Sequence, residues 1–209
     1  MPEATRPGVL HLGPGLDADL AAALERGARE PGVRAVVLHL DATSQLPTDV
    51  DGRALLARCV RAVLAGDVPV VAHLAERVGT AACALALVSD AVVADRSTSL
   101  QLGGPARGGI SLTLPAAVGR LRARRLLLLG EPVTAVSAAD WGVVTHLVPS
   151  GSTATARVGT VLDSLLAHDP LTLTGSRRAL DAPLVADLED ALAREDRTAA
   201  LLARHSPSA

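Results

Sequence analysis

The chain has 209 residues, 49% of them hydrophobic, and a formal net charge of −2. That length is typical of one domain with a sizeable core. The near-neutral charge gives no basis for binding nucleic acid or an anionic membrane surface. No apolar run of about 18 residues is present, and the first residues lack the pattern of a signal peptide. We therefore expect a cytoplasmic protein without a membrane span.

Several residue types are missing from the composition. The chain contains no Phe, Tyr, Lys or Asn, and one Trp, Trp141. Without lysine it cannot form the Schiff base of lysine-dependent catalysis, and its core must be built from Leu, Val and Ala. Cys59 and Cys83 both lie in apolar runs, which predicts two buried free thiols.

The first half of the chain predicts strands that alternate with helices. The run at 34–40 is apolar almost throughout, which is typical of a parallel strand covered on both faces. Asp17 precedes a helical pattern and is a credible N-cap. The predicted strands are 8–12, 34–40 and 68–74, and the predicted helices are 18–29 and 51–65.

The second half predicts one buried helix and then a helical C-terminus. The run that follows Gly79 is apolar all round, which predicts a buried helix. Pro115 is predicted to open an arginine-rich helix, because proline suits a first helical turn. We expect helices at 80–88, 153–167, 170–180 and 183–204, short strands at 91–94 and 99–102, and a glycine-rich loop at 103–109.

The most informative pattern is LLLLGEPVTA at 126–135, followed by SAADWGVVTHLVP at 137–149. It resembles the T-G-E-x-I-x-A-x-E-A-x-x-x-G-L-V-x-x-V-V segment of the crotonase (enoyl-CoA hydratase/isomerase) family. The runs at 32–38 and 69–90 resemble further family motifs in the same order, without a gap from Pro69 to Asp90. The similarity covers about residues 16–180, and the chain is identified as a divergent member of this family.

The resemblance implies an α/β fold of the ClpP/crotonase type, a βαβ spiral with C-terminal helices. The alternation of strands and helices agrees, because it predicts βαβ units with a mainly parallel sheet. We therefore expect a core domain at 1–150 and a C-terminal helical oligomerisation region at 151–209. Family members use such helices to form trimers or hexamers, so the resemblance implies a homo-oligomer.

The resemblance also implies a reaction class. Family members polarise the carbonyl of an acyl thioester with two backbone N–H groups, and such donors stabilise a developing oxyanion by roughly 2.7–4 kcal/mol each. The implied donors are Ala81 and Thr48, and Asp49 occupies the family's Asp position. Pro47 has no N–H, so the register of this loop matters. Coenzyme A or phosphopantetheine would enter as part of the substrate, with no tightly bound cofactor.

The usual acid and base of the hydratases are missing at the matching positions. Their two glutamates correspond to Ala84 and to about Gly104, and hydration of a double bond needs such a pair. Arg107 in the glycine-rich loop could bind a phosphate or carboxylate, with Asp49 as the other implied cofactor-binding residue. No His, Cys, Asp or Glu shows metal-ligand spacing, so no metal is predicted. The replacement candidates are Gln101, Arg107, Glu76, Arg77, His73 and Asp41.

The implied oxyanion donors and the missing glutamates together suggest two possible functions. The first is an enzyme that stabilises an enolate of a CoA-bound or carrier-bound acyl group, during dehydration, hydration or isomerisation in specialised bacterial metabolism. The second is a non-catalytic accessory subunit that stimulates a partner such as a polyketide-type synthase. The chain is somewhat similar to the small, glutamate-poor crotonase-like proteins of the dihydroxyphenylglycine pathway, in which that role is known.

Other features have ordinary interpretations beside functional ones. The run around Cys83 resembles the G-x-A-A-S nucleophile segment of Clp-type serine proteases, but the histidine that those enzymes need about 25 residues later is missing, so a buried structural thiol is favoured. His39 and His73 are interpreted as partnered core histidines. The arginines of 120–125 form a basic helical face that could meet phosphates, and a solvated face or subunit contact is the plainer interpretation.

Overall fold

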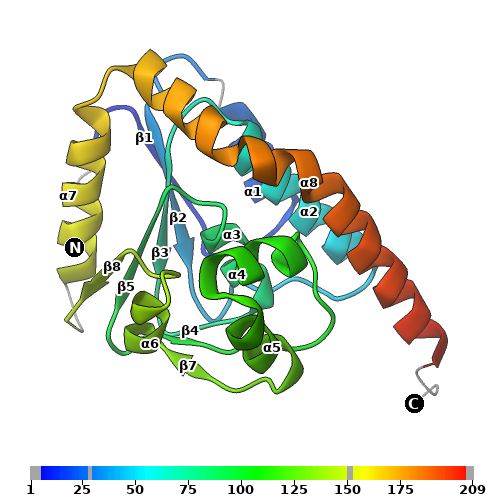
Figure 1. The fold of residues 1–209 in the computed structure, drawn as a ribbon. Coiled ribbons are helices and arrows are strands. Elements are labelled where there is room, and N and C mark those ends of the chain that lie inside the picture. The colour runs from blue at the N-terminus through cyan, green and yellow to red at the C-terminus, as the bar shows by residue number, and fades with distance from the viewer. Residues whose placement is uncertain (1–5, 28–29, 150–152, 206–209) are drawn as a thin grey trace.

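The computed structural model describes residues 6–27, 30–149 and 153–205. In these ranges a five-stranded parallel sheet forms the centre, in the order β1-β2-β3-β5-β8 (Figure 1). The parallel α/β class predicted from the alternation is therefore confirmed. The strands are β1 (Val9–Leu12), β2 (Ala35–Leu40), β3 (Val70–Leu74), β5 (Ala91–Asp95) and β8 (His146–Val148).

Both faces of this sheet are covered, as its apolar strands predict. In β2, Val36 and Leu38 enter the larger hydrophobic cluster and Val37 enters the smaller one on the other face. Helix α7 (Thr153–Leu166) covers the smaller cluster, and the other helices lie on the opposite side (Figure 1). Helices α1 (Ala18–Gly27), α2 (Val50–Ala65) and α3 (Thr80–Ala86) contribute to the larger cluster.

A second, three-stranded sheet lies beside the first. Strand β4 (Arg77–Val78) pairs in parallel with β6 (Ser99–Leu100), which pairs antiparallel with β7 (Val133–Thr134). The sequence did not predict β4 and β7, because two residues are too few to show an alternating pattern. This small sheet positions the chain just before α3, where the candidate site lies.

The arginine-rich helix does not begin at Pro115, so that prediction is wrong. Pro115 lies inside α4 (Ile110–Val118), and Gly119 separates α4 from α5 (Arg120–Leu128). Gly119 has a φ of 80°, a conformation that glycine adopts without steric cost. The expected helix is therefore divided into two, and α6 (Ala135–Asp140) follows.

The C-terminal helix is longer than predicted. Helix α8 runs without interruption from Pro170 to His205 and passes Pro183, where the sequence predicted a new helix. Pro183 removes one helical N–H, but Pro183 and Ala179, its partner four residues earlier, are both exposed to solvent. Water can satisfy the carbonyl that the proline leaves without a donor, so the helix continues. It packs on α2 and α4 (Figure 1).

The predicted N-cap of α1 is confirmed, because the Asp17 carboxylate accepts the N–H of Leu20 at 2.8 Å. The predicted end of that helix, at 28–29, and the boundary between the two expected domains, at 150–151, lie outside the described residues. None of the helices in the described ranges combines the length and the apolar character needed to cross a membrane.

Glu76 has a left-handed backbone conformation, with a φ of 56°, and is the one residue besides glycines to do so in the described ranges. Because its side chain is exposed, we expect Glu76→Gly to relieve backbone strain without losing packing. The Glu76→Gly variant should be more stable than Glu76→Ala by about 1 kcal/mol, measured by urea unfolding. Alanine is the matched control, since it shortens the side chain and keeps the strain. Equal stability of the two variants would contradict this explanation.

Candidate functional site

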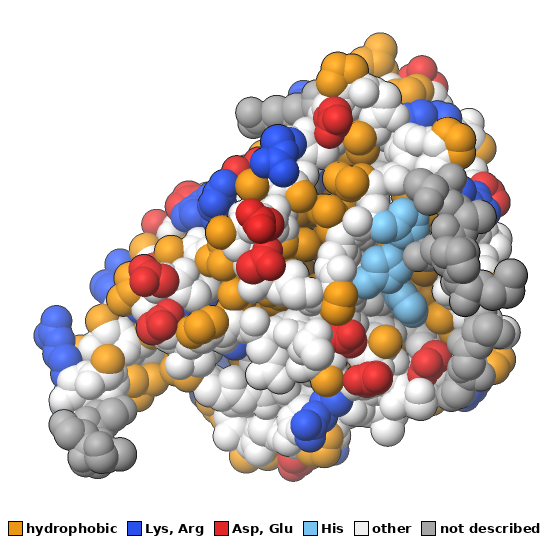
Figure 2. Space-filling model, turned by 180° about the vertical axis from the view of Figure 1, so that it is seen from behind, with side chains coloured by type: hydrophobic (Ala, Val, Ile, Leu, Met, Phe, Trp, Pro, Cys, Tyr) orange, Lys and Arg blue, Asp and Glu red, His pale blue; other side chains and the backbone are white. Residues whose placement is uncertain are grey.

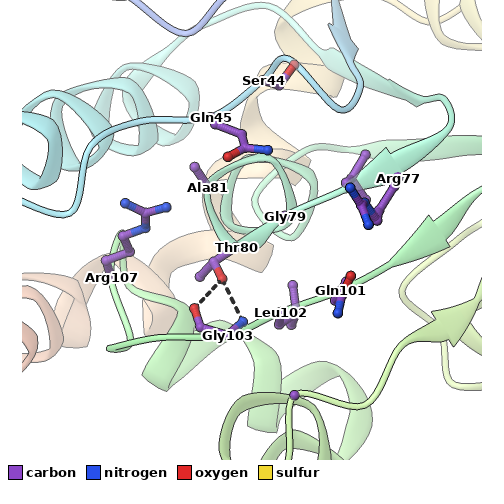
Figure 3. A pocket seen from close by; sticks show the side chains of 12 residues that line it. Ser44, Gln45, Arg77, Gly79, Thr80, Ala81, Gln101, Leu102, Gly103 and Arg107 are labelled. Atoms are coloured by element: carbon purple, nitrogen blue, oxygen red, sulfur yellow. Dashed lines mark hydrogen bonds between the residues drawn. The ribbon is translucent and has the colours of Figure 1, made fainter.

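A cavity of about 500 Å³ lies where the loop after β2, the start of α3 and the segment after β6 meet (Figure 3). Amides, hydroxyls and guanidinium groups make up most of its side-chain lining. The residues that line it are Ser44, Gln45, Arg77, Val78, Gly79, Thr80, Ala81, Gln101, Leu102, Gly103, Arg107 and Gly130.

The first turn of α3 forms the inner wall of the cavity. Its first helical hydrogen bond runs from the N–H of Cys83 to the carbonyl of Gly79, at 3.0 Å. The N–H groups of Thr80 and Ala81 come before it and have no acceptor within the helix. Ala81 is 1% exposed, and the positive end of the helix dipole favours negative charge here. The wall therefore offers shielded backbone donors, at the position predicted for Ala81.

Thr80 joins this wall to the opposite one. Its hydroxyl donates to the carbonyl of Gly103 at 3.0 Å and accepts the N–H of Gly103 at 3.2 Å (Figure 3). The side chain is 4% exposed. The two bonds hold the segment after β6 at a set distance from the start of α3, so the width of the cavity depends on this threonine.

Arg107 lines the cavity, and one nitrogen of its guanidinium is already bound. Its Nη1 donates to the carbonyls of Leu46 and Pro47, each at 2.9 Å. Burial, and then the charge of Arg53, lower the pKa of Arg107, although a guanidinium stays protonated throughout the physiological range. Arg107 thus fixes the loop between β2 and α2, and through it the Ser44–Gln45 wall.

Thr48 and Asp49 take positions in the same loop but outside the described cavity lining. Both are exposed. The Thr48 carbonyl accepts from Arg53 at 2.6 Å, and the Asp49 carboxylate caps α2 by accepting the N–H of Gly52 at 2.8 Å. The residues of this loop that line the cavity are Ser44 and Gln45, which the sequence reasoning missed. Their place after a parallel strand is the signal that could have found them.

Of the other candidates, Gln101 and Arg77 line the cavity, whereas Glu76, His73 and Asp41 are outside its described lining. Gln101 extends from the end of β6 (Figure 3). Asp41 instead accepts the N–H and the hydroxyl of Thr43, at 2.7 and 2.6 Å.

The two positions that match the hydratase glutamates lie in different surroundings. Ala84 is fully buried, and a Cβ built on Gly108 would come within 3.2 Å of the Ala84 Cβ. Gly104 is exposed. In the structure, Ala84 therefore lies in a packed core contact and Gly104 lies at the surface.

Helix α8 reaches the far side of the glycine-rich loop through Glu195. Its carboxylate is buried and accepts the N–H groups of Gly109 and Ser111, both at 2.8 Å. A Cβ at Gly109 would meet Leu188 of α8 at 2.8 Å, so glycine allows this close approach. The C-terminal helix thus caps α4 and holds the loop that carries Arg107.

Histidine side chains gather in one patch on the rear face (Figure 2). His11, His39 and His73 are half-buried, and their ring nitrogens lie in series, at 3.0 Å and 3.3 Å. The alternation of β2 and β3 places His39 and His73 on the face that α7 covers. They are partnered, as predicted, but half-buried rather than in the core. No group of three or more His, Cys, Asp or Glu in the described ranges is arranged to hold a metal ion.

The basic helix α5 covers the single tryptophan. The guanidinium carbons of Arg122 and Arg125 lie 5.1 and 6.0 Å from the centre of the Trp141 ring, within the range of a cation–π interaction. Arg125 also forms an ion pair with Glu131. Two of the predicted basic-face arginines therefore contact the protein itself.

Both cysteines are buried free thiols, as predicted. Burial raises the pKa of Cys83 to about 12 and that of Cys59 to about 11. Because the thiolate is the reactive form, we expect neither cysteine to react with a thiol reagent at pH 8 until the chain unfolds. Reaction of the folded protein at the rate of the unfolded chain would contradict this.

The raised pKa values also make stability depend on pH. As the pH rises above 9.0, the ordinary pKa of a cysteine thiol, both thiols lose their protons in the unfolded chain before they do so in the folded one, and stability should fall.

Comparisons with known proteins place the chain in a family. The family model for enoyl-CoA hydratase/isomerase matches residues 49–205. The 2,3-dehydroadipyl-CoA hydratase of Escherichia coli (strain K12) is 31% identical over 128 residues, which are 59% of this chain and 50% of that protein. The chain therefore spans about half the length of this curated relative.

Solved structures agree with this placement. An enoyl-CoA hydratase from Mycobacterium avium subsp. paratuberculosis K-10 is 30% identical, with a TM-score of 0.79 over 90% of this chain and 78% of that one. OdaA of Pseudomonas aeruginosa is 24% identical and supports the fold, with a TM-score of 0.82 over 97% of this chain and 92% of that one. The chain has the crotonase fold and belongs to the enoyl-CoA hydratase/isomerase family.

Proposed function

We propose that the cavity binds an acyl thioester, of coenzyme A or of a carrier-protein phosphopantetheine, with its carbonyl oxygen on the N–H of Ala81. The observation that carries this proposal is the buried first turn of α3 at an inner wall of the cavity, where the N–H groups of Thr80 and Ala81 come before Cys83, the first residue whose N–H donates within the helix. A donor that is held in place before the reaction needs no reorganisation as negative charge develops. Thr48 stays a prediction for the second donor.

The chemistry that such a site supports begins with enolate formation. Polarising the thioester carbonyl acidifies the neighbouring carbon, whose proton can pass to a base from solvent. The enolate can then expel a leaving group from the β-carbon, or take up a proton at the γ-carbon and so move a double bond. In hydration, water adds to the β-carbon of an enoyl thioester and forms the same enolate, which is then protonated at the α-carbon. Gln101 can orient a water or a substrate oxygen by hydrogen bonding, although an amide does not accept a proton near neutral pH. We propose the class of dehydration, hydration or isomerisation on this basis.

The second candidate is a thioester-binding accessory subunit without turnover of its own, for a partner such as a polyketide-type synthase in specialised bacterial metabolism. One observation favours it: none of the twelve described lining residues is Asp, Glu or His. These are the usual acids and bases of proton transfer. Binding without catalysis would explain a polar, thioester-sized cavity that lacks them.

We also propose that the chain forms a cytoplasmic homo-oligomer, a trimer or hexamer. Apolar side chains are exposed on α5, at its C-cap and on α8, as expected for surfaces that pack against other subunits. They include Leu121, Leu128, Leu129, Leu171 and Leu180, each at least 68% exposed. Light scattering coupled to size-exclusion chromatography would measure the mass, and a monomer at micromolar concentration would contradict this proposal.

The test uses the purified chain alone. Calorimetry with butyryl-CoA measures binding, and hydration of crotonyl-CoA and dehydration of 3-hydroxybutyryl-CoA measure turnover. Exchange of the α-protons of butyryl-CoA in deuterium oxide, followed by NMR, reports enolate formation without a complete reaction. Binding with exchange or turnover supports the enzyme, and binding without either supports the accessory subunit. Absence of binding to both butyryl-CoA and butyryl-pantetheine would exclude both.

A further inference from the structure

The charge of the cavity differs from that of the whole protein. Its lining contains two arginines and, among the described residues, no Asp or Glu, whereas the chain as a whole carries −2. The N–H groups at the start of α3 add further positive potential. A cavity of this kind favours an anionic ligand over a neutral one.

The two arginines are not equivalent. The Nη1 of Arg107 donates to two loop carbonyls. Arg77 lies on the other side of the start of α3 (Figure 3), on the backbone of β4, which pairing with Ser99 of β6 holds in place. Its exposed guanidinium makes no ion pair or hydrogen bond with any residue of the described ranges. The whole guanidinium of Arg77 is therefore available to a ligand, whereas the Nη1 of Arg107 is already bound.

The rest of the lining sets the character of the ligand near Arg77. Gln45 and Gln101 are exposed and present amides. The Ser44 hydroxyl is buried and already donates to the carbonyl of Pro14 and accepts the N–H of Asp41. The apolar side chains of Val78 and Leu102 are buried away from solvent. The described lining has no aromatic side chain, and its apolar side chains are those of Val78, Ala81 and Leu102. A short chain that ends in a polar group matches such a lining better than a fatty acyl chain does.

We propose that the ligand is a short acyl thioester whose acyl chain carries a carboxylate, and that Arg77 binds this carboxylate. The proposal rests on the thioester binding proposed above and names the class of acyl group. A guanidinium fits a carboxylate with two parallel hydrogen bonds. A phosphate of coenzyme A would offer similar chemistry, so the test must separate the two sources.

The test compares four thioesters by calorimetry at one salt concentration: glutaryl-CoA, valeryl-CoA, glutaryl-pantetheine and valeryl-pantetheine. The glutaryl and valeryl chains have the same number of carbons and differ in the carboxylate, and the pantetheine forms lack the nucleotide phosphates. We expect the wild-type protein to bind both glutaryl thioesters at least tenfold more tightly than the valeryl ones. Arg77→Gln should abolish that preference and leave valeryl binding unchanged.

Two further variants complete the experiment. Arg77→Lys keeps the charge but loses the planar fork, so it should retain only part of the preference. Arg96→Gln removes an exposed arginine outside the cavity lining and should retain all of it. Circular dichroism should be the same for all variants, since Arg77 is exposed.

The remaining outcomes are distinguishable. Equal binding of glutaryl and valeryl thioesters by the wild-type protein would overturn this proposal and leave thioester binding intact. Loss of CoA binding in Arg77→Gln, whatever the acyl group, with pantetheine binding unchanged would assign Arg77 to a phosphate and also overturn it. Absence of binding to all four thioesters would instead overturn the proposed function itself.

Discussion

Replacing Arg177 with alanine is expected to lower the free energy of unfolding by about 3–5 kcal/mol, the usual cost of removing one partner of a buried ion pair. Arg177 on α8 is 6% exposed. Its Nε donates to Asp90 at 2.6 Å, and its Nη1 donates to the carbonyl of Gly66 at 2.9 Å. The variant would leave the Asp90 carboxylate, whose side chain is 16% exposed, and the buried carbonyl of Gly66 without their donor.

The Asp90 carboxylate has a second role that raises the cost. Its other oxygen accepts the N–H of Val70 at 2.7 Å, at the start of β3. Arg177 and Asp90 therefore connect α8 to the central sheet. Burial, followed by the charge of Asp90, raises the pKa of the nearby Asp181. Without Arg177, no positive charge at this position would offset the repulsion between the carboxylates of Asp90 and Asp181.

The adjacent arginine provides the matched control. Arg178 is exposed and forms an ion pair with Asp67 at 2.5 Å, so Arg178→Ala should cost less than about 1 kcal/mol. Guanidinium unfolding of both variants, with comparable slopes, gives the difference. Similar losses for Arg177→Ala and Arg178→Ala would contradict the importance assigned to burial.

Glu195→Ala is expected to cost about 3 kcal/mol, because it leaves the N–H groups of Gly109 and Ser111 without their acceptor and removes a negative charge from the start of α4. Glu195 is 4% exposed, so water cannot easily replace it. We also expect faster amide hydrogen exchange over residues 103–113, since this carboxylate holds the glycine-rich loop. Unfolding measurements and exchange mass spectrometry test the two effects separately.

Glu189 on the same helix is the control for this second change. It pairs with Arg61 of α2 at 2.6 Å, but both side chains are largely exposed. Glu189→Ala should therefore change the unfolding free energy by less than about 1 kcal/mol and leave exchange at 103–113 unaltered. Glu195→Gln should lie between the wild type and Glu195→Ala, because an amide oxygen can replace only one of the two acceptors. Unchanged exchange in Glu195→Ala would contradict its role in holding the loop.

Local sequence signals predicted a structural feature well when that feature depends only on residues close to it in the chain. Asp17 caps α1 as predicted, because a side-chain acceptor placed just before a helix needs no distant partner. Asp49, for which the resemblance implied a binding role, caps α2 in the same way. The signals failed at Pro115 and Pro183, which both lie inside helices. A proline weakens the helical hydrogen bonding of one turn only. It does not predict the end of a helix that packing against neighbouring elements stabilises.

In the candidate site, too, some features follow from the local sequence and others depend on distant contacts. Ala81, which the resemblance implied, and Gln101 and Arg107, which the sequence offered as candidates, line the cavity, and their roles stay predictions. Thr48 lies outside that lining. The path of its loop depends on two hydrogen bonds from Arg107, 60 and 61 residues away in the chain, and no local pattern encodes them.

By itself, the sequence determined the family, the parallel sheet and the buried start of α3, since apolar periodicity and glycine-rich turns are local properties that survive divergence. Only the tertiary structure decided that Arg107 holds a cavity wall and Arg77 does not, and that α8 supports the site. The contacts of Glu195 and Arg177 bridge 84 to 111 residues. Their free energies come from burial, which exists only after the chain has folded.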